Sequence, residues 1–188
     1  MTSIKKQRLL RTAFSCLPPG EAYLEIGTFQ GKSLLSAMAG NPSRPVYACD
    51  NFSEFQDRNS LQRLTANLRE YDAMERVTFF DGDFRAIMSR DHISEPVGLY
   101  FYDGAHDLES QRDGVALAEP LLAAEALVLV DDWRLAEDSG SYAEAGTREA
   151  LEHSSHDWEL LYELPARWNG DHGMWWNGIG VLAFRRRG

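Results

Sequence analysis

Short apolar runs alternate with helix-like segments along the chain, and this alternation limits the possible folds more than any other feature. Runs such as LVLV at 127–130 are apolar on both faces of an extended segment, which is typical of strands that helices cover on both sides. The alternation predicts an α/β, doubly wound domain with a mainly parallel, seven-stranded sheet. The expected strands are Tyr23–Ile26, Val46–Cys49, Val77–Phe80, Val97–Tyr102, Ala126–Val130, Trp158–Leu164 and Ile179–Phe184.

The segments between these runs carry apolar residues near the helical period. We expect one domain over residues 1–188, whose first nineteen residues form a helical extension that LPPG closes. The last two strands are joined by a segment rich in Gly, Asn and Trp, which predicts an antiparallel hairpin with a long tip. Helices are expected at Lys32–Ala39, Ser60–Tyr71, Arg85–Asp91, Leu108–Ala124 and Tyr142–His153.

Charge and cysteine content exclude several classes of protein. A net charge of −10 repels phosphate backbones, so we expect no nucleic-acid partner, and we interpret the basic tail Arg185–Arg187 as a solvated end. Two cysteines are too few for a disulfide framework and favour a reducing, cytoplasmic location. We expect neither a signal peptide nor a membrane span, because no apolar run is long enough.

The stretch YLEIGTFQGKS, which starts at Tyr23, ends the first strand with an acid and two glycines. In parallel sheets ligands bind beyond the carboxyl ends of the strands, and Gly27 would let a ligand approach the backbone there. The spacing is one residue too short for a phosphate-binding P-loop. Phe29 replaces the middle glycine of a dinucleotide fingerprint, so the loop suits a ligand other than a pyrophosphate.

Acid–x–Gly–x–x–x–Gly after the first strand resembles the first motif of the class I S-adenosylmethionine-dependent methyltransferases. The next strands also end in acids, with VYACD at 46–50, DGDF at 81–84, FYDGAH at 101–106 and VLVDDW at 128–133. The resemblance covers roughly residues 20–185 and implies that Asp50 binds both ribose hydroxyls. It implies cofactor contacts from Glu25, Gly27, Thr28, Phe29, Gly31, Ser33, Asp50, Asn51, Phe52, Gly82, Asp83, Phe84 and Asp103.

Three aspartates, Asp103, Asp131 and Asp132, are expected at adjacent strand ends. Carboxylates this close require a proton or a cation, and hard oxygen ligands select ions such as Mg²⁺. Their spacing resembles the metal-dependent small-molecule O-methyltransferases, which implies a divalent ion that lowers the pKa of a substrate hydroxyl. In the alternative interpretation, Asp131 and Asp132 cap the following turn and pair with Arg134.

His106 lies three residues after Asp103, where the resemblance places a general base, so Asp103 and His106 are the predicted catalytic residues. An imidazole can accept a proton near neutral pH. The DGxH form also resembles a broader methyltransferase group in which a metal is not a constant feature. A structural hydrogen bond of His106 near a helix start is the alternative.

The aromatic residues near the site allow two interpretations. Trp133 packs over the cofactor or the substrate, or it belongs to the core. The tip segment RWNGDHGMWWNG (167–178), with His172, contacts substrate, caps the hairpin or forms a dimer contact. The chain adds little to the core fold, so the pocket is open or completed by a second subunit, and we favour a homodimer.

The leading hypothesis is a methyltransferase that transfers a methyl group from S-adenosyl-L-methionine to an oxygen of a small molecule with the help of Mg²⁺ or another hard divalent cation. A catalytically silent module that binds the same cofactor is the first alternative. A nicotinamide-dependent oxidoreductase is the second, and the missing middle glycine counts against it.

Overall fold

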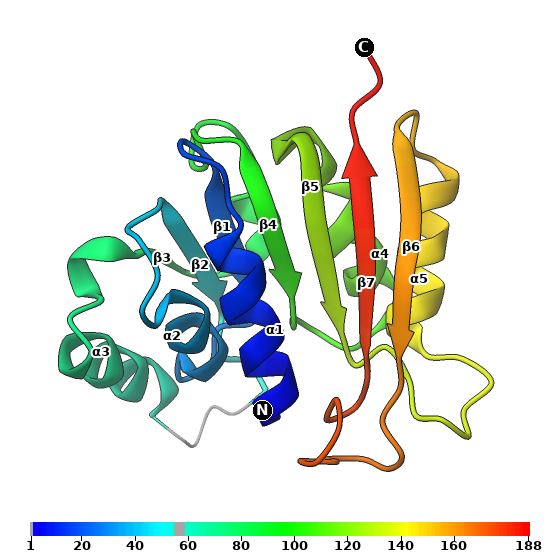
Figure 1. Ribbon diagram of the computed structural model, residues 1–188, viewed down its shortest axis with the longest axis horizontal. Coiled ribbons are helices and arrows are strands. Elements are labelled where there is room, and N and C mark those ends of the chain that lie inside the picture. Colours follow the sequence, from blue (N-terminus) through cyan, green and yellow to red (C-terminus); the bar gives the residue numbers. More distant parts are fainter. Residues whose placement is uncertain (1, 55–58) are drawn as a thin grey trace.

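The computed structural model describes residues 2–54 and 59–188. These residues form a seven-stranded sheet in the order β3-β2-β1-β4-β5-β7-β6 (Figure 1). β1 to β5 pair in parallel, whereas β7 is antiparallel to β5 and β6, which confirms the predicted fold class and hairpin. The strands are Ala22–Ile26 (β1), Val46–Asp50 (β2), Thr78–Asp81 (β3), Val97–Tyr102 (β4), Leu122–Asp131 (β5), Asp157–Leu164 (β6) and Ile179–Arg185 (β7).

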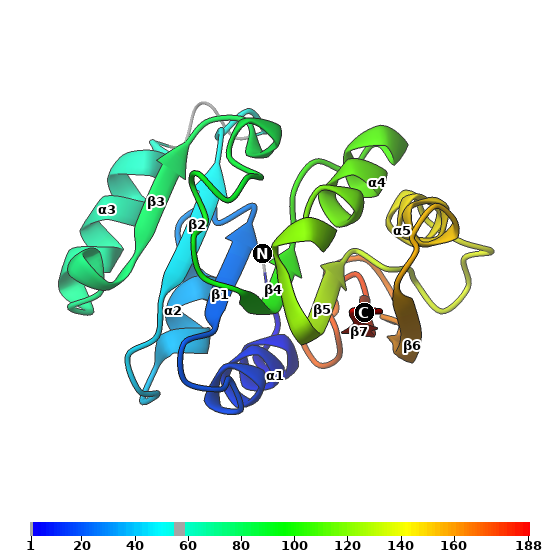
Figure 2. The ribbon, with the colours of Figure 1, turned by 90° about the horizontal axis from the view of Figure 1, so that it is seen from above.

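Helices cover both faces of the sheet (Figures 1 and 2). One apolar cluster joins the sheet to Leu10 of α1, Leu34 of α2 and Leu64 of α3, and a second cluster joins it to Val115 of α4 and Ala143 of α5. The two layers explain why the inner strands are apolar on both faces. The helices are Ile4–Ser15 (α1), Lys32–Met38 (α2), Ser60–Glu70 (α3), Leu108–Ala116 (α4) and Tyr142–Glu152 (α5).

Two of the predicted helices are shorter in the structure. Within the expected helix 85–91 there is only the 3₁₀ turn Phe84–Ala86 (η3), capped by the Asp83 carboxylate, and a separate turn follows it. The expected helix 108–124 ends as α4 at Ala116, because Pro120 has no N–H to donate to the Ala116 carbonyl and its ring would clash with that carbonyl in a continued helix. The 3₁₀ turns Glu119–Leu121 (η4) and Met74–Arg76 (η2) precede β5 and β3.

The parallel strands end at one edge of the sheet, and the N-terminus of α1 lies at the same edge (Figure 1). Ser3 caps α1 by accepting a hydrogen bond from the backbone N–H of Lys6. The loops after β1, β2, β4 and β5 therefore lie at the same edge of the sheet as the start of α1 (Figure 1). Among the helices of the described residues, none has both the length and the apolar character needed to cross a bilayer.

Candidate active site

A cavity of about 300 Å³ lies at the carboxyl edge of the strands. Its walls come from the loops after β1 to β5 and from the β6–β7 connection. The position matches the usual ligand site of an open α/β sheet. The predicted site residues that line it are Gly27, Phe29, Asp50, Asn51, Phe52, Gly82, Asp83, Phe84, Asp103, His106 and Asp132.

The loop after β1 is held close to the end of β4. Gly27 has φ +87°, and a Cβ at this position would lie 1.8 Å from the carbonyl oxygen of Asp103. Gly31, also at positive φ, starts α2, and its N–H donates to the Thr28 carbonyl to close the turn. Both positions therefore favour glycine because of their positive φ, and Gly27 also leaves no room for a Cβ beside Asp103.

Asp50 connects the ends of β1 and β2. Its carboxylate accepts hydrogen bonds from the backbone N–H of Phe29 and of Phe52, both at 2.6 Å, one to each oxygen. Burial raises the pKa of Asp50, and these two N–H groups counteract the rise. A carboxylate has about four acceptor positions, so each oxygen retains capacity for one ribose hydroxyl.

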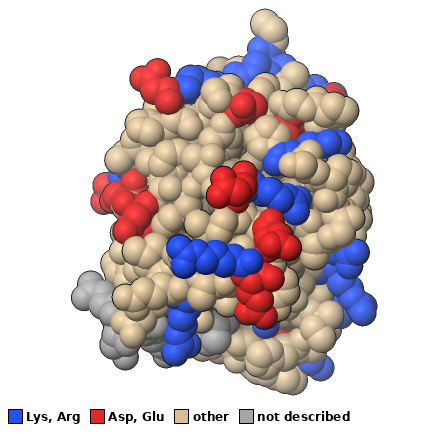
Figure 3. All heavy atoms as spheres, turned by 90° about the vertical axis from the view of Figure 1, so that its left-hand side faces the viewer, with Lys and Arg blue, Asp and Glu red and all other residues tan. Residues whose placement is uncertain are grey.

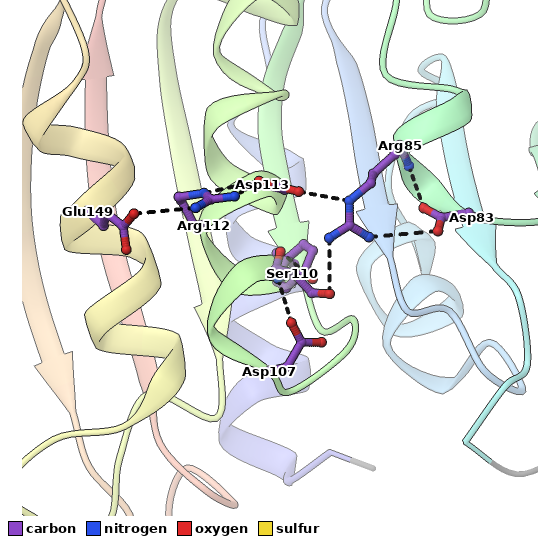
Figure 4. Close-up of polar contacts among 8 residues, drawn as sticks. Asp83, Arg85, Asp107, Ser110, Arg112, Asp113 and Glu149 are labelled. Carbon is purple, nitrogen blue, oxygen red and sulfur yellow. Dashed lines mark hydrogen bonds and ion pairs between the residues drawn. The ribbon is translucent and has the colours of Figure 1, made fainter.

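The loop after β3 is fixed to α4 and α5 by a charged network (Figure 4). The Asp83 carboxylate accepts from the Arg85 N–H at 2.8 Å, and the Arg85 guanidinium pairs with Asp113, also at 2.8 Å. Arg112 extends the network from Asp113 to Glu149 on α5. The network holds the segment that presents Gly82 and Phe84 to the cavity.

Glu25 lies beneath the cavity rather than in its wall. It is fully buried and accepts hydrogen bonds from the hydroxyls of Tyr23 and Ser33. The pKa of Glu25 is raised to about 8, chiefly by burial and to a smaller extent by Asp103, while the hydrogen bonds from the two hydroxyls oppose the rise. Thr28 and Ser33 are buried as well and, with Gly31, support the loop from below instead of lining the cavity.

His106 is placed between two carboxylates at the rim of the cavity. Its Nδ1 lies 3.1 Å from Asp132 Oδ2, and its Nε2 lies 3.3 Å from Glu54 Oε1. Asp132 adopts a left-handed conformation with φ +52°, which is uncommon for residues other than glycine, and its side chain reaches His106. Asp103 faces the same cavity, and burial followed by the nearby Asp132 raises its pKa to about 7.

Asp131 points away from the cavity. Its carboxylate is 2% exposed and pairs with the ammonium group of Lys6, which is fully buried in α1. Within residues 2–54 and 59–188 there is no cluster of three or more acidic, His or Cys side chains suited to hold a metal. The donor set expected from Asp103, Asp131 and Asp132 therefore does not form, and the side chains present do not fit a divalent ion.

The alternatives for neighbouring residues are resolved by their contacts. Arg134 pairs with Glu163 of β6, not with the two aspartates. Trp133 is 1% exposed and belongs to the core cluster on the α4 and α5 face. In the tip, Trp176 lines the cavity, whereas Trp168 is 54% exposed. The tip thus contributes a wall to the site.

Several cavity residues were missed by sequence reasoning. Glu54, Asn169 and Asn177 line the cavity, as does Cys49 of β2. The two asparagines precede glycines in the tip segment, a turn signal that gives no indication of a binding role. Lys6 could have been suspected, since it shares a helical stripe with Leu10 and Phe14.

Comparison with known proteins identifies the class. Residues 24–133, more than half of the chain, match a family model described as a methyltransferase domain. The chain therefore belongs to this family, the class I S-adenosylmethionine-dependent methyltransferases, and it is an enzyme that uses S-adenosylmethionine (SAM).

Solved structures share the fold at low sequence identity. Cofactor-bound Rv0187 from MTB is 20% identical, with a TM-score of 0.69 over 100% of this chain and 83% of that one. The O-methyltransferase TomG from Streptomyces achromogenes, involved in tomaymycin synthesis and solved with SAM, is 17% identical. Its TM-score is 0.65 over 97% of this chain and 78% of TomG. An O-methyltransferase from Bacillus cereus, in complex with S-adenosylhomocysteine (SAH), is 15% identical. Its TM-score is 0.65 over 97% of this chain and 79% of the Bacillus cereus chain.

Proposed function

We propose that the enzyme methylates a hydroxyl oxygen of a small molecule and that His106 accepts the hydroxyl proton. The observation that carries this proposal is the position of the His106 ring, between Asp132 and Glu54 at the cavity rim. SAM supplies the electrophilic methyl group when bound. The residues of the chain bind the two reactants, orient them and take up the proton.

The cofactor would be held by the loops after β1, β2 and β3. Asp50 accepts the ribose hydroxyls, while Gly27 leaves the backbone free for close approach to the amino-acid end. Phe84, Gly82 and Asp83 form the wall for the adenine.

The acceptor would bind in a second cavity beside the first. This cavity, about 260 Å³, shares His106, Asp132, Asn169 and Asn177 with the larger one. Its further lining includes Arg134, Asp138, Ser141 and Tyr142, which together offer hydrogen-bond donors and acceptors. A polar wall of this kind supports a hydroxylated acceptor over a purely apolar one.

Proton removal would follow from the two contacts of His106. In the structure both ring nitrogens face carboxylates, Nδ1 toward Asp132 and Nε2 toward Glu54. To act as a base, the ring would be neutral, with Nδ1–H donated to Asp132, and Glu54 would move aside to expose the Nε2 lone pair. An acceptor hydroxyl that displaces Glu54 would donate to Nε2, and Asp132 would stabilise the imidazolium formed when the proton moves. His106 thereby serves as the base and Asp132 as its positioning residue.

A small molecule fits the charge distribution better than a nucleic acid. On the face shown in Figure 3, acidic and basic side chains are interspersed rather than gathered into a basic stripe. With a net charge of −10, the chain lacks the electrostatic attraction that phosphate backbones require.

We also propose a homodimer, supported by the exposed Trp168 ring, over which the Arg167 guanidinium lies at 4.3 Å. Light scattering over a concentration series measures the mass in solution. A dimer that dissociates in Trp168→Ala places the contact at the tip, and a monomer at all concentrations contradicts the proposal.

The main experiment is a radiolabelled methyl-transfer screen with phenols, sugars and hydroxy acids, preceded by calorimetry with SAH. We expect SAH to bind and at least one hydroxylated compound to be methylated. Absence of SAH binding would refute the proposal at its first step, and transfer confined to amines would refute the oxygen acceptor.

A further inference from the structure

Lys6 occupies an unusual position for a lysine. It lies in the first turn of α1 and is fully buried, in line with the core residues Leu10 and Phe14. Lysine is almost never fully buried unless it is paired, because removing an ammonium group from water is costly. Its partner is Asp131 Oδ1, at the end of β5.

Asp131 is held in place by this contact. Its Oδ1 also accepts the backbone N–H of Asp132 at 2.8 Å, while Oδ2 is buried and has no hydrogen-bond partner among the described residues. A buried carboxylate with one unpartnered oxygen stays ionised only beside a positive charge. Lys6 is the cation that the structure places there.

A chain of contacts leads from Lys6 to the proposed base. Lys6 pairs with Asp131, the Asp131 carboxylate accepts the N–H of Asp132, and the Asp132 carboxylate meets His106 at 3.1 Å. The ammonium group therefore sits at the start of a path that sets the orientation of the His106 ring.

Given the proposed function, we propose that the Lys6 ammonium replaces a divalent cation at this strand edge and that methyl transfer by this enzyme requires no metal ion. Lys6 neutralises Asp131 from behind the cavity, and it leaves Asp132 free to hold His106. Lys6 is a positioning residue, since it acts through Asp131 and Asp132 and does not line the cavity.

Mn²⁺ titration of the full chain without cofactor tests this inference, with melting temperature as a second readout. We expect wild type to bind no Mn²⁺ and to show no change in melting temperature. Lys6→Ala leaves space beside an uncompensated Asp131 carboxylate, so it should melt at a lower temperature and bind Mn²⁺ with an affinity at least about tenfold above the detection limit at which wild type shows no binding. Mn²⁺ should then restore part of its thermal stability.

Lys6→Met is the matched variant. Its side chain has similar length but no charge, so it should also lose stability, yet its thioether fills the space and should prevent the gain in Mn²⁺ binding. Mn²⁺ binding by Lys6→Ala but not by Lys6→Met would show that Lys6 occupies the place of a cation. A lysine with only a structural role would lower stability in both variants without any gain in Mn²⁺ binding.

Two results would overturn the inference. The first is Mn²⁺ binding by wild type that Asp131→Asn abolishes. The second is a folded Lys6→Ala variant with no gain in Mn²⁺ affinity. If Lys6→Ala fails to fold, the wild-type titration decides, together with methyl transfer to the screened acceptor after EDTA treatment, which should be unchanged. The titration needs neither cofactor nor acceptor, so it can fail or succeed independently of the proposed function.

Discussion

The Asp50 carboxylate accepts the backbone N–H of Phe29 at 2.6 Å and thereby ties the end of β2 to the glycine loop after β1. One side chain thus fixes the loop and presents the oxygens that we assign to the ribose.

Asp50→Ala should weaken SAH binding at least about tenfold, because both roles are lost. Calorimetry measures the affinity, and Asp91→Ala, on an exposed loop away from the cavity, is the control. Equal affinities in the two variants would contradict the role of Asp50.

Gly27→Ala should abolish SAH binding or prevent folding, because the new Cβ would overlap the Asp103 carbonyl, 1.8 Å away. Gly20→Ala is a matched control, since Gly20 has the same φ of +87° and nothing within 4 Å of the added atom. Both variants suffer the dihedral strain, so the difference between their unfolding free energies isolates the steric overlap. If Gly27→Ala were as stable as Gly20→Ala, the loop after β1 would be able to move away from the Asp103 carbonyl, and the expected overlap would be contradicted.

His106→Asn should lower kcat by about a hundredfold or more, the usual contribution of a general base, with the SAH affinity changed less than about threefold. Asp132→Asn should lower kcat as well, through the loss of ring orientation. Steady-state kinetics on the acceptor found by the screen, with His153→Asn as the surface control, measures these effects. An unchanged kcat in His106→Asn would show that the base lies elsewhere.

Glu25→Gln should make the cofactor-free protein less sensitive to alkaline pH. The pKa of Glu25 rises from its usual 4.5 to about 8 in the folded state through burial, so the folded chain keeps a proton that the unfolded chain releases. Stability is therefore lost as the pH rises from about 4.5 to 8. Denaturant titrations at pH 5 and pH 9 should show a smaller loss in Glu25→Gln than in wild type, whereas Glu159→Gln, at an exposed position, should behave like wild type. A loss in Glu25→Gln equal to that of wild type would mean that Glu25 is already ionised in the fold.

The strand pattern was predictable because burial on both faces leaves long apolar runs, as in β4, whose bounds Val97–Tyr102 match the expected ones. The acids that end the strands were equally visible, and most of them line the cavity. The helix expected at 85–91 was wrong because helical spacing of apolar residues also occurs in consecutive turns. Local patterns carry no information on whether the turns continue into a helix.

The partners of the site residues were less accessible from sequence. Asp131 looked like a cavity ligand, but its carboxylate faces Lys6, a residue 125 positions earlier in the chain. Glu54 and Asn177 reach the cavity through loop paths that depend on tertiary packing. Sequence spacing identifies which acids end strands, while the direction of each side chain depends on what packs behind it.

The contact between Lys6 and Asp131 also affects the order of events during synthesis. The ribosome makes α1 before the sheet, yet the lysine of this helix has no partner until β5 has emerged, 125 residues later. A nascent chain therefore carries an unpaired ammonium group on the apolar face of α1, and this helix can dock fully only when most of the sheet has been translated.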